Sequence, residues 1–105
     1  MKPENIFAAI PADLDNELFE VLVSSENVTI EKIISRGHQS PESGWYDQER
    51  NEWVLVLKGC AKLMFDDHAV VNLKAGDFIL IPPHKKHKVS WTDPDQETVW
   101  LAVYF

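Results

Sequence analysis

The chain has 105 residues, 45% of them hydrophobic, and a formal net charge of −7. This length suits one domain with one core, and the hydrophobic content excludes a disordered chain. The acidic balance opposes contact with the phosphate backbone of a nucleic acid, so we expect no nucleic-acid partner.

No apolar run approaches the roughly 20 residues that a membrane-spanning helix needs, so we expect no membrane partner. The first residues lack the basic stretch and long apolar segment of a secretory signal peptide. Cys60 is the single cysteine, so no internal disulfide can form. Together these features predict a cytoplasmic protein in a reducing compartment.

Residues 1–16 differ in pattern from the rest of the chain. The segment 5–10 is apolar, and the segment 11–16 has the polar residues and the proline of a turn. We therefore expect a short N-terminal arm over residues 1–16, packed on a single domain of residues 17–105.

From residue 17 onward the hydrophobic pattern has a period close to two, and β-branched and aromatic residues are common. Polar clusters, glycines and prolines separate the apolar runs, as they do between strands. The pattern predicts about eight or nine short strands, at 17–23, 28–34, 45–48, 52–57, 60–65, 69–73, 78–81, 87–92 and 98–105. Such regularly spaced strands indicate a sandwich or a barrel, in which few strand edges stay open.

Glu52 leads directly into the apolar strand Trp53–Leu57 and shares a face with Val54 and Val56. If that face points inward, a carboxylate lies at the rim of the barrel, where it needs a hydrogen-bond donor or a cation. The alternative is an exposed glutamate at the start of a strand.

His87 presents the same choice on another strand. It shares a face with Val89 and Trp91, which predicts that the imidazole points into the barrel. A lone inward histidine is either a hydrogen-bonded core residue or a functional one.

The chain resembles the cupin superfamily in two motifs. Glu52, six residues and Gly59 match the end of the first cupin motif, and Gly76, five residues, Pro82 and then His87 match the second. The resemblance covers roughly residues 37–105. It implies an all-β, cupin-type double-stranded β-helix, which is a jelly-roll barrel with the N-terminal arm attached.

In cupins, four residues of these motifs usually hold a divalent metal, and here they correspond to Tyr46, Gln48, Glu52 and His87. The first motif is therefore degenerate, because Tyr46 and Gln48 stand where cupins have histidines. In a variant of the motif spacing, Asp47 is the candidate oxygen ligand. The resemblance leaves two alternatives, a divalent Mn, Fe, Ni or Zn ion held by Glu52, His87, Gln48 or Asp47, and a metal-free polar pocket.

The resemblance implies a small cupin-like protein that binds a small polar or anionic molecule in the barrel mouth. If the protein is an enzyme, Glu52 and His87 would be the catalytic residues of an isomerase, a decarboxylase or an oxygenase. In one version of this hypothesis the enzyme depends on a bound metal ion. Tyr46, Gln48, His38 and Trp91 would contact the ligand, with His38 in a loop that could cover the entrance. The alternatives are a binding or sensing module without metal, and a purely structural barrel.

Two further expectations concern partners. The basic cluster at 85–88 could attract an anionic small molecule, or it is a solvated loop. The apolar arm and the aromatic last strand predict a homodimer, because small cupins are often dimers.

Overall fold

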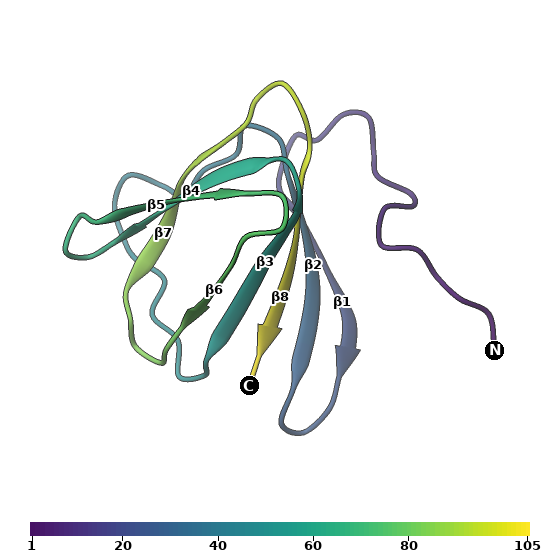
Figure 1. Cartoon of the computed structure of the whole chain (residues 1–105), viewed down its shortest axis with the longest axis horizontal. Helices are drawn as coiled ribbons and strands as arrows, with labels where there is room; N and C mark the ends of the chain where they lie inside the picture. Colours follow the sequence, from purple (N-terminus) through teal and green to yellow (C-terminus); the bar gives the residue numbers. More distant parts are fainter.

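The computed structural model describes all residues, 1–105, and contains strands but no helices (Figure 1). The strands are β1 (Leu18–Ser24), β2 (Thr29–Ser35), β3 (Glu52–Lys58), β4 (Cys60–Phe65), β5 (Val70–Lys74), β6 (Phe78–Ile81), β7 (His87–Thr92) and β8 (Thr98–Tyr104). The predicted all-β class is confirmed. The prediction of a strand at 45–48 is wrong: this segment forms only an isolated bridge, between Tyr46 and His87.

The strands form two antiparallel sheets that face each other (Figure 1). The larger sheet has the order β1-β2-β8-β3-β6, and the smaller has the order β5-β4-β7. The chain passes from the larger to the smaller sheet between β3 and β4, at Gly59, whose φ of 91° lies in the left-handed region that favours glycine. This crossing brings the inner faces of β3 and β4 together.

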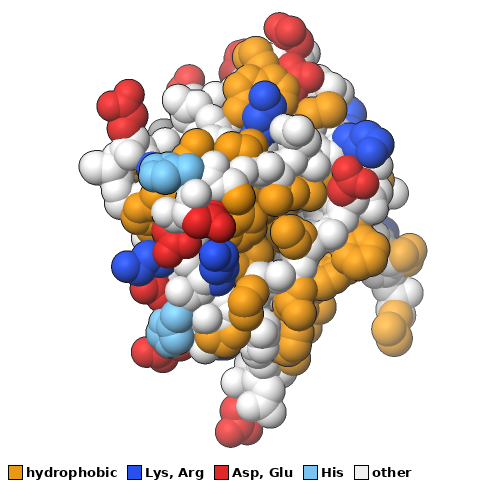
Figure 2. Space-filling model, turned by 60° about the vertical axis from the view of Figure 1, so that its left-hand side comes forward, with side chains coloured by type: hydrophobic (Ala, Val, Ile, Leu, Met, Phe, Trp, Pro, Cys, Tyr) orange, Lys and Arg blue, Asp and Glu red, His pale blue; other side chains and the backbone are white.

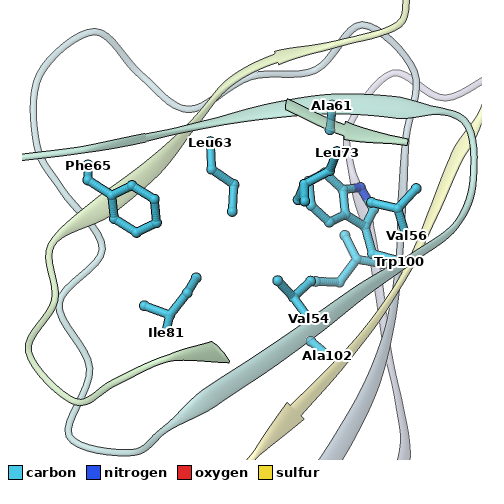
Figure 3. Close-up of a cluster of buried hydrophobic side chains, with 10 residues drawn as sticks. Val54, Val56, Ala61, Leu63, Phe65, Leu73, Ile81, Trp100 and Ala102 are labelled. Atoms are coloured by element: carbon cyan, nitrogen blue, oxygen red, sulfur yellow. The ribbon is translucent and has the colours of Figure 1, made fainter. Parts of the chain in front are cut away.

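The hydrophobic core lies between the two sheets and uses alternate residues of each strand (Figure 3). From the larger sheet, β3 contributes Val54 and Val56, and β8 contributes Trp100. From the smaller sheet, β4 contributes Leu63 and Phe65. Each large apolar side chain removed from water in this way contributes about 1.5–3 kcal/mol to folding. The core fixes which face of each strand looks inward, and therefore which polar residues do.

Residues 1–16 form no strand and run beside β1 and β2 (Figure 1). The Lys32 side chain, on the outer face of β2, donates a hydrogen bond to the backbone carbonyl of Ile6 at 3.1 Å. Lys32 is 5% exposed and also lies 3.5 Å from the carboxylate of Glu20. Both faces of β2 are therefore covered, the inner by the core and the outer partly by the arm.

The structure contains no long apolar helix of the kind that crosses a bilayer.

Candidate functional site

A cavity of about 160 Å³ opens between the two sheets, beside the apolar core. Its apolar wall consists of Phe19, Ile33, Val54, Leu63, Val89 and Trp100. Its polar side chains are Glu17, Tyr46, Gln48, Glu52, His87 and Tyr104. An apolar cavity with a few converging polar groups is the usual form of a small-molecule site.

Glu52 and His87 meet at the inner wall of this cavity. Glu52 is the first residue of β3 and is 9% exposed, while His87 is the first residue of β7 and is 4% exposed. The imidazole Nε2 lies 3.3 Å from the Glu52 Oε1 atom. The Gln48 amide donates a second hydrogen bond to the same oxygen at 2.6 Å. The sequence therefore placed both residues on inward faces correctly, and the structure brings them into contact.

The backbone around Tyr46 holds the backbone of His87 in place. Tyr46 and His87 exchange two backbone hydrogen bonds, of 2.8 and 3.1 Å. This bridge ties the loop before β3 to β7, so Tyr46 and Gln48 reach the cavity although 45–48 is not a strand. The ring of Tyr46 lies 5.8 Å from the imidazole, centroid to centroid.

The protonation of His87 follows from its two hydrogen-bond partners. Its Nδ1 atom lies 2.8 Å from the carbonyl oxygen of Lys85, which can only accept, so Nδ1 carries a proton. Burial lowers the pKa of His87, but the hydrogen bonds to Glu52 and the Lys85 carbonyl, with the charge of Glu52, outweigh burial and raise it above 6.5. The pair is therefore an imidazolium and a carboxylate over a wider pH range than free histidine allows.

The ion pair of Glu52 and His87 should make both the titration of His87 and the stability of the fold depend on pH in a defined way. We expect His87 to titrate above the ordinary value of 6.5 in an NMR titration of its ring signals, and Glu52→Gln to lower that pKa. Because the pKa is raised in the folded state, the pair stabilises the fold fully below pH 6.5, and this contribution is lost as the pH rises through the raised pKa. Glu52→Gln should thus cost more unfolding free energy near about pH 6 than near about pH 9. A His87 pKa at or below 6.5 would contradict the ion pair.

A second polar group of the cavity was not predicted from the sequence. The Tyr104 hydroxyl at the end of β8 lies close enough to the carboxylate of Glu31 on β2 for each group to affect the pKa of the other. Burial, then the charges of Glu52 and Glu31, raise the pKa of Tyr104 well above its usual range, so it remains a neutral hydroxyl. Burial and the charge of Glu52 raise the pKa of Glu31, against the lowering effect of the Tyr104 hydroxyl.

Glu17 is the second carboxylate, after Glu31, that was not predicted from the sequence. It lies just before β1, and Ser35 donates a hydrogen bond to its Oε2 atom at 2.5 Å. The indole N–H of Trp100 in turn donates to the Ser35 hydroxyl at 3.2 Å. The register of the strands would have been needed to find Glu17, because it is adjacent to these residues only in the folded sheet.

Three of the sequence-predicted residues lie outside the cavity lining. Asp47 is turned outward between Tyr46 and Gln48, and its carboxylate lies 2.8 Å from the Nδ1 atom of His84 at the surface. His38 accepts a hydrogen bond from the backbone N–H of Arg36 at 2.9 Å. Neither residue is among those that form the cavity wall.

Trp91 is the third, and here the prediction from alternation was wrong. Leu63 pairs with Val89 and Lys62 with Trp91, so Ser90 is an extra residue, a β-bulge in β7. After the bulge the faces are exchanged: Trp91 is 36% exposed and Thr92 is 1% exposed. Trp91 therefore lies on the outer face of the smaller sheet, where its ring is 5.5 Å from the Lys62 ammonium.

The donor set does not fit the four-ligand metal centre that the cupin motifs imply. Protein sites for divalent transition metals use at least three strong side-chain ligands. No three His, Cys, Asp or Glu side chains are arranged so that they could hold one metal ion. Glu52 and His87 are in contact, but their nearest polar neighbour, Gln48, presents its NH₂ group to Glu52 as a donor.

Two facing antiparallel sheets around one polar cavity define a double-stranded β-helix protein of the jelly-roll type. The family described as "Cupin domain" matches residues 34–104. The chain therefore belongs to the cupin-domain family.

Among solved structures, the chain is similar to a Ralstonia eutropha protein described provisionally as a mannose-6-phosphate isomerase, with 40% identity and a TM-score of 0.94. That match covers 99% of this chain and 97% of the other. An RmlC-like cupin from Desulfovibrio desulfuricans has 22% identity and a TM-score of 0.76, and covers 99% and 96%. A cupin superfamily protein from Desulfitobacterium hafniense has 22% identity and a TM-score of 0.75, and covers 91% and 83%. These last two support the fold alone. A comparison with curated proteins found no match.

Proposed function

We propose that this cupin binds a small polar molecule in the cavity between its sheets without a metal ion, with Glu52 and His87 as the central contacts. The observation that carries the proposal is the buried contact between the two side chains, 3.3 Å apart in the wall of the cavity. The pair offers a ligand the second carboxylate oxygen of Glu52 as a charged acceptor at a fixed place, while both N–H groups of the imidazolium are held by Glu52 and the Lys85 carbonyl. A degenerate first cupin motif, with Tyr46 and Gln48 in place of histidines, is part of this proposal.

Metal analysis of the purified protein tests the metal-free part of the proposal. After expression with added Mn, Fe, Ni and Zn, we expect well under one equivalent of any of them, because only two strong ligands meet. His87→Ala should leave that low content unchanged. One equivalent of a metal that disappears in His87→Ala would overturn the proposal in favour of a metalloenzyme.

An isomerase is the second candidate function, and the observation that favours it is the 40% identity to the Ralstonia eutropha protein. Glu52 and His87 could move a proton between adjacent carbons of a sugar, as a general base and acid. Incubation with mannose 6-phosphate, followed by an assay for its ketose isomer, tests this candidate. Loss of turnover in Glu52→Gln would assign the reaction to the pair.

We also propose that the protein is a homodimer that uses the outer face of the larger sheet. The strand register aligns one apolar row across all five strands, Val23, Ile30, Val103, Trp53 and Leu80. Phe78 continues the apolar surface and is 63% exposed. Figure 2, which brings the left-hand side of Figure 1 forward, shows hydrophobic side chains exposed over the middle of that face, with charged side chains around them. The row contains no charged residue, so a second copy can cover it without placing like charges opposite each other along the row.

Sedimentation checks this interface. We expect a dimer at micromolar concentration, and a monomer after Phe78→Asp with Leu80→Asp, because buried carboxylates oppose packing of an apolar face. Val70→Asp places the same charge on β5, at a residue that is 48% exposed and outside the row, and should leave the dimer intact. A wild-type monomer would contradict the proposal.

A further inference from the structure

The cavity has an unusual balance of charged side chains. None of the ten Lys and Arg residues lines it, whereas Glu17 and Glu52 both do. His87 is the single basic side chain in the wall, and it is already paired with Glu52. The charge that a ligand meets is therefore set by Glu17.

Glu17 has no cationic partner in the protein. Its Oε2 atom accepts the hydrogen bond from Ser35, and none of the ion pairs of the chain includes it. The Glu52 carboxylate, by contrast, has both an imidazole and an amide as neighbours. Because Glu17 lies beside an apolar wall, where water screens charge less than in bulk, its charge acts strongly on a bound molecule.

The two carboxylates lie near opposite ends of β8. Ser35, the partner of Glu17, pairs with Thr98 at the start of that strand, and Glu52 pairs with Tyr104 at its end. A cation at Glu17 is thus separated along the sheet from the positive charge of His87. It gains the attraction of the Glu17 carboxylate, and the paired carboxylate of Glu52 offsets the more distant charge of the imidazolium.

The basic cluster at 85–88 does not supply the cavity with a positive charge. The Lys85 ammonium lies 3.4 Å from the Asp66 carboxylate, and the Lys88 ammonium lies 4.4 Å from the centre of the Trp45 ring. No lysine of the cluster lines the cavity wall. An anionic ligand would meet uncompensated negative charge there.

We propose that the cavity prefers a ligand that carries a positively charged amine to one that carries an anion, and that Glu17 receives the ammonium group. This inference rests on the proposed function and narrows it, since a phosphorylated or carboxylated ligand is disfavoured. The apolar wall takes the rest of the molecule. An apolar cavity of about 150 Å³ is large enough for a benzene ring, so a ring with a short polar arm suits this one of about 160 Å³.

Three probes that share a benzyl group and carry a positive, a neutral or a negative polar group test the proposal: benzylamine, benzyl alcohol and phenylacetate. Each is titrated into the full-length protein, and binding is followed by NMR at the indole N–H of Trp100, which lines the cavity. We expect benzylamine to bind about tenfold more tightly than benzyl alcohol, as a charge-assisted hydrogen bond allows, and phenylacetate to bind least. The wild-type series needs no variant and so does not depend on folding of a mutant.

The variant Glu17→Gln then tests whether the preference for benzylamine comes from Glu17. It should reduce benzylamine binding about tenfold and leave benzyl alcohol unchanged. Glu26→Gln removes the same charge from the exposed β1–β2 turn and should alter neither probe. The inference is overturned if phenylacetate binds as tightly as benzylamine, or if Glu17→Gln keeps the full preference for benzylamine. Binding of benzyl alcohol without any preference for the amine would overturn the inference but keep the proposed function; no binding of any probe would overturn both.

Discussion

Replacing Gly59 with alanine should destabilise the fold by about 4 kcal/mol or prevent folding, because two independent costs add at this residue. The φ of Gly59 is 91°, a conformation that L side chains rarely adopt. A Cβ atom there would lie 2.5 Å from the Thr98 Oγ1 atom, 2.7 Å from the Thr98 Cα atom and 2.8 Å from the Glu97 carbonyl oxygen. Urea unfolding followed by tryptophan fluorescence measures the loss.

The neighbours of Gly59 cannot move aside easily. Thr98 is fully buried, and its hydroxyl donates to the carbonyl of Cys60 at 3.1 Å and accepts from the Cys60 N–H at 3.3 Å. These hydrogen bonds connect the β3–β4 link at Gly59, where the chain passes between the two sheets, to the first residue of β8. A shift of Thr98 would therefore disturb the strand that carries Trp100 and Tyr104 into the cavity.

Gly76→Ala is the matched control. Its φ is 93°, close to that of Gly59, but a Cβ atom there would have no neighbour within 4 Å. Backbone strain alone should cost about 1–2 kcal/mol at that turn. Equal losses for Gly59→Ala and Gly76→Ala would show that the close approach to Thr98 does not matter.

Alternation and turn residues were enough to predict eight strands, the barrel class and the two inward side chains Glu52 and His87. On β3 the alternation of Glu52, Val54 and Val56 is regular, and all three are buried. This worked because one face of β3 packs on the core and the pattern has no irregularity before the residues that matter. Alternation did not place Tyr46 and Gln48 at the cavity; the resemblance to the first cupin motif did.

The predictions failed where the pattern alone does not determine the structure. The bulge at Ser90 exchanges the inner and outer faces of β7 for the residues that follow it. No residue at this position is typical of a bulge, so Trp91 was assigned to the wrong face. On β2 both Lys32 and Ile33 are buried, because the outer face is also covered, and alternation cannot then identify the inner side. Glu31 was missed for that reason, and Glu17 because its neighbours come from strands distant in sequence.

Replacing His87 with leucine should cost about 3 kcal/mol of unfolding free energy, whereas Glu52→Leu should cost clearly less. The first change leaves a buried carboxylate with only the Gln48 amide as a close partner. The second leaves an imidazole that can lose its charge and still donate Nδ1–H to the Lys85 carbonyl. Removing one member of a buried pair is costly mainly because the other remains charged and unpaired.

The double variant Glu52→Leu with His87→Leu tests this explanation directly. It should be more stable than His87→Leu alone, because no unpaired charge remains and leucine suits the apolar wall. Glu49→Leu removes a negative charge at an exposed residue and should change stability by no more than about 0.5 kcal/mol. Simple additivity of the two single changes would mean that Glu52 and His87 do not interact. A folded double variant that no longer binds a polar ligand would mean that the pair is retained for binding rather than for the stability of the barrel.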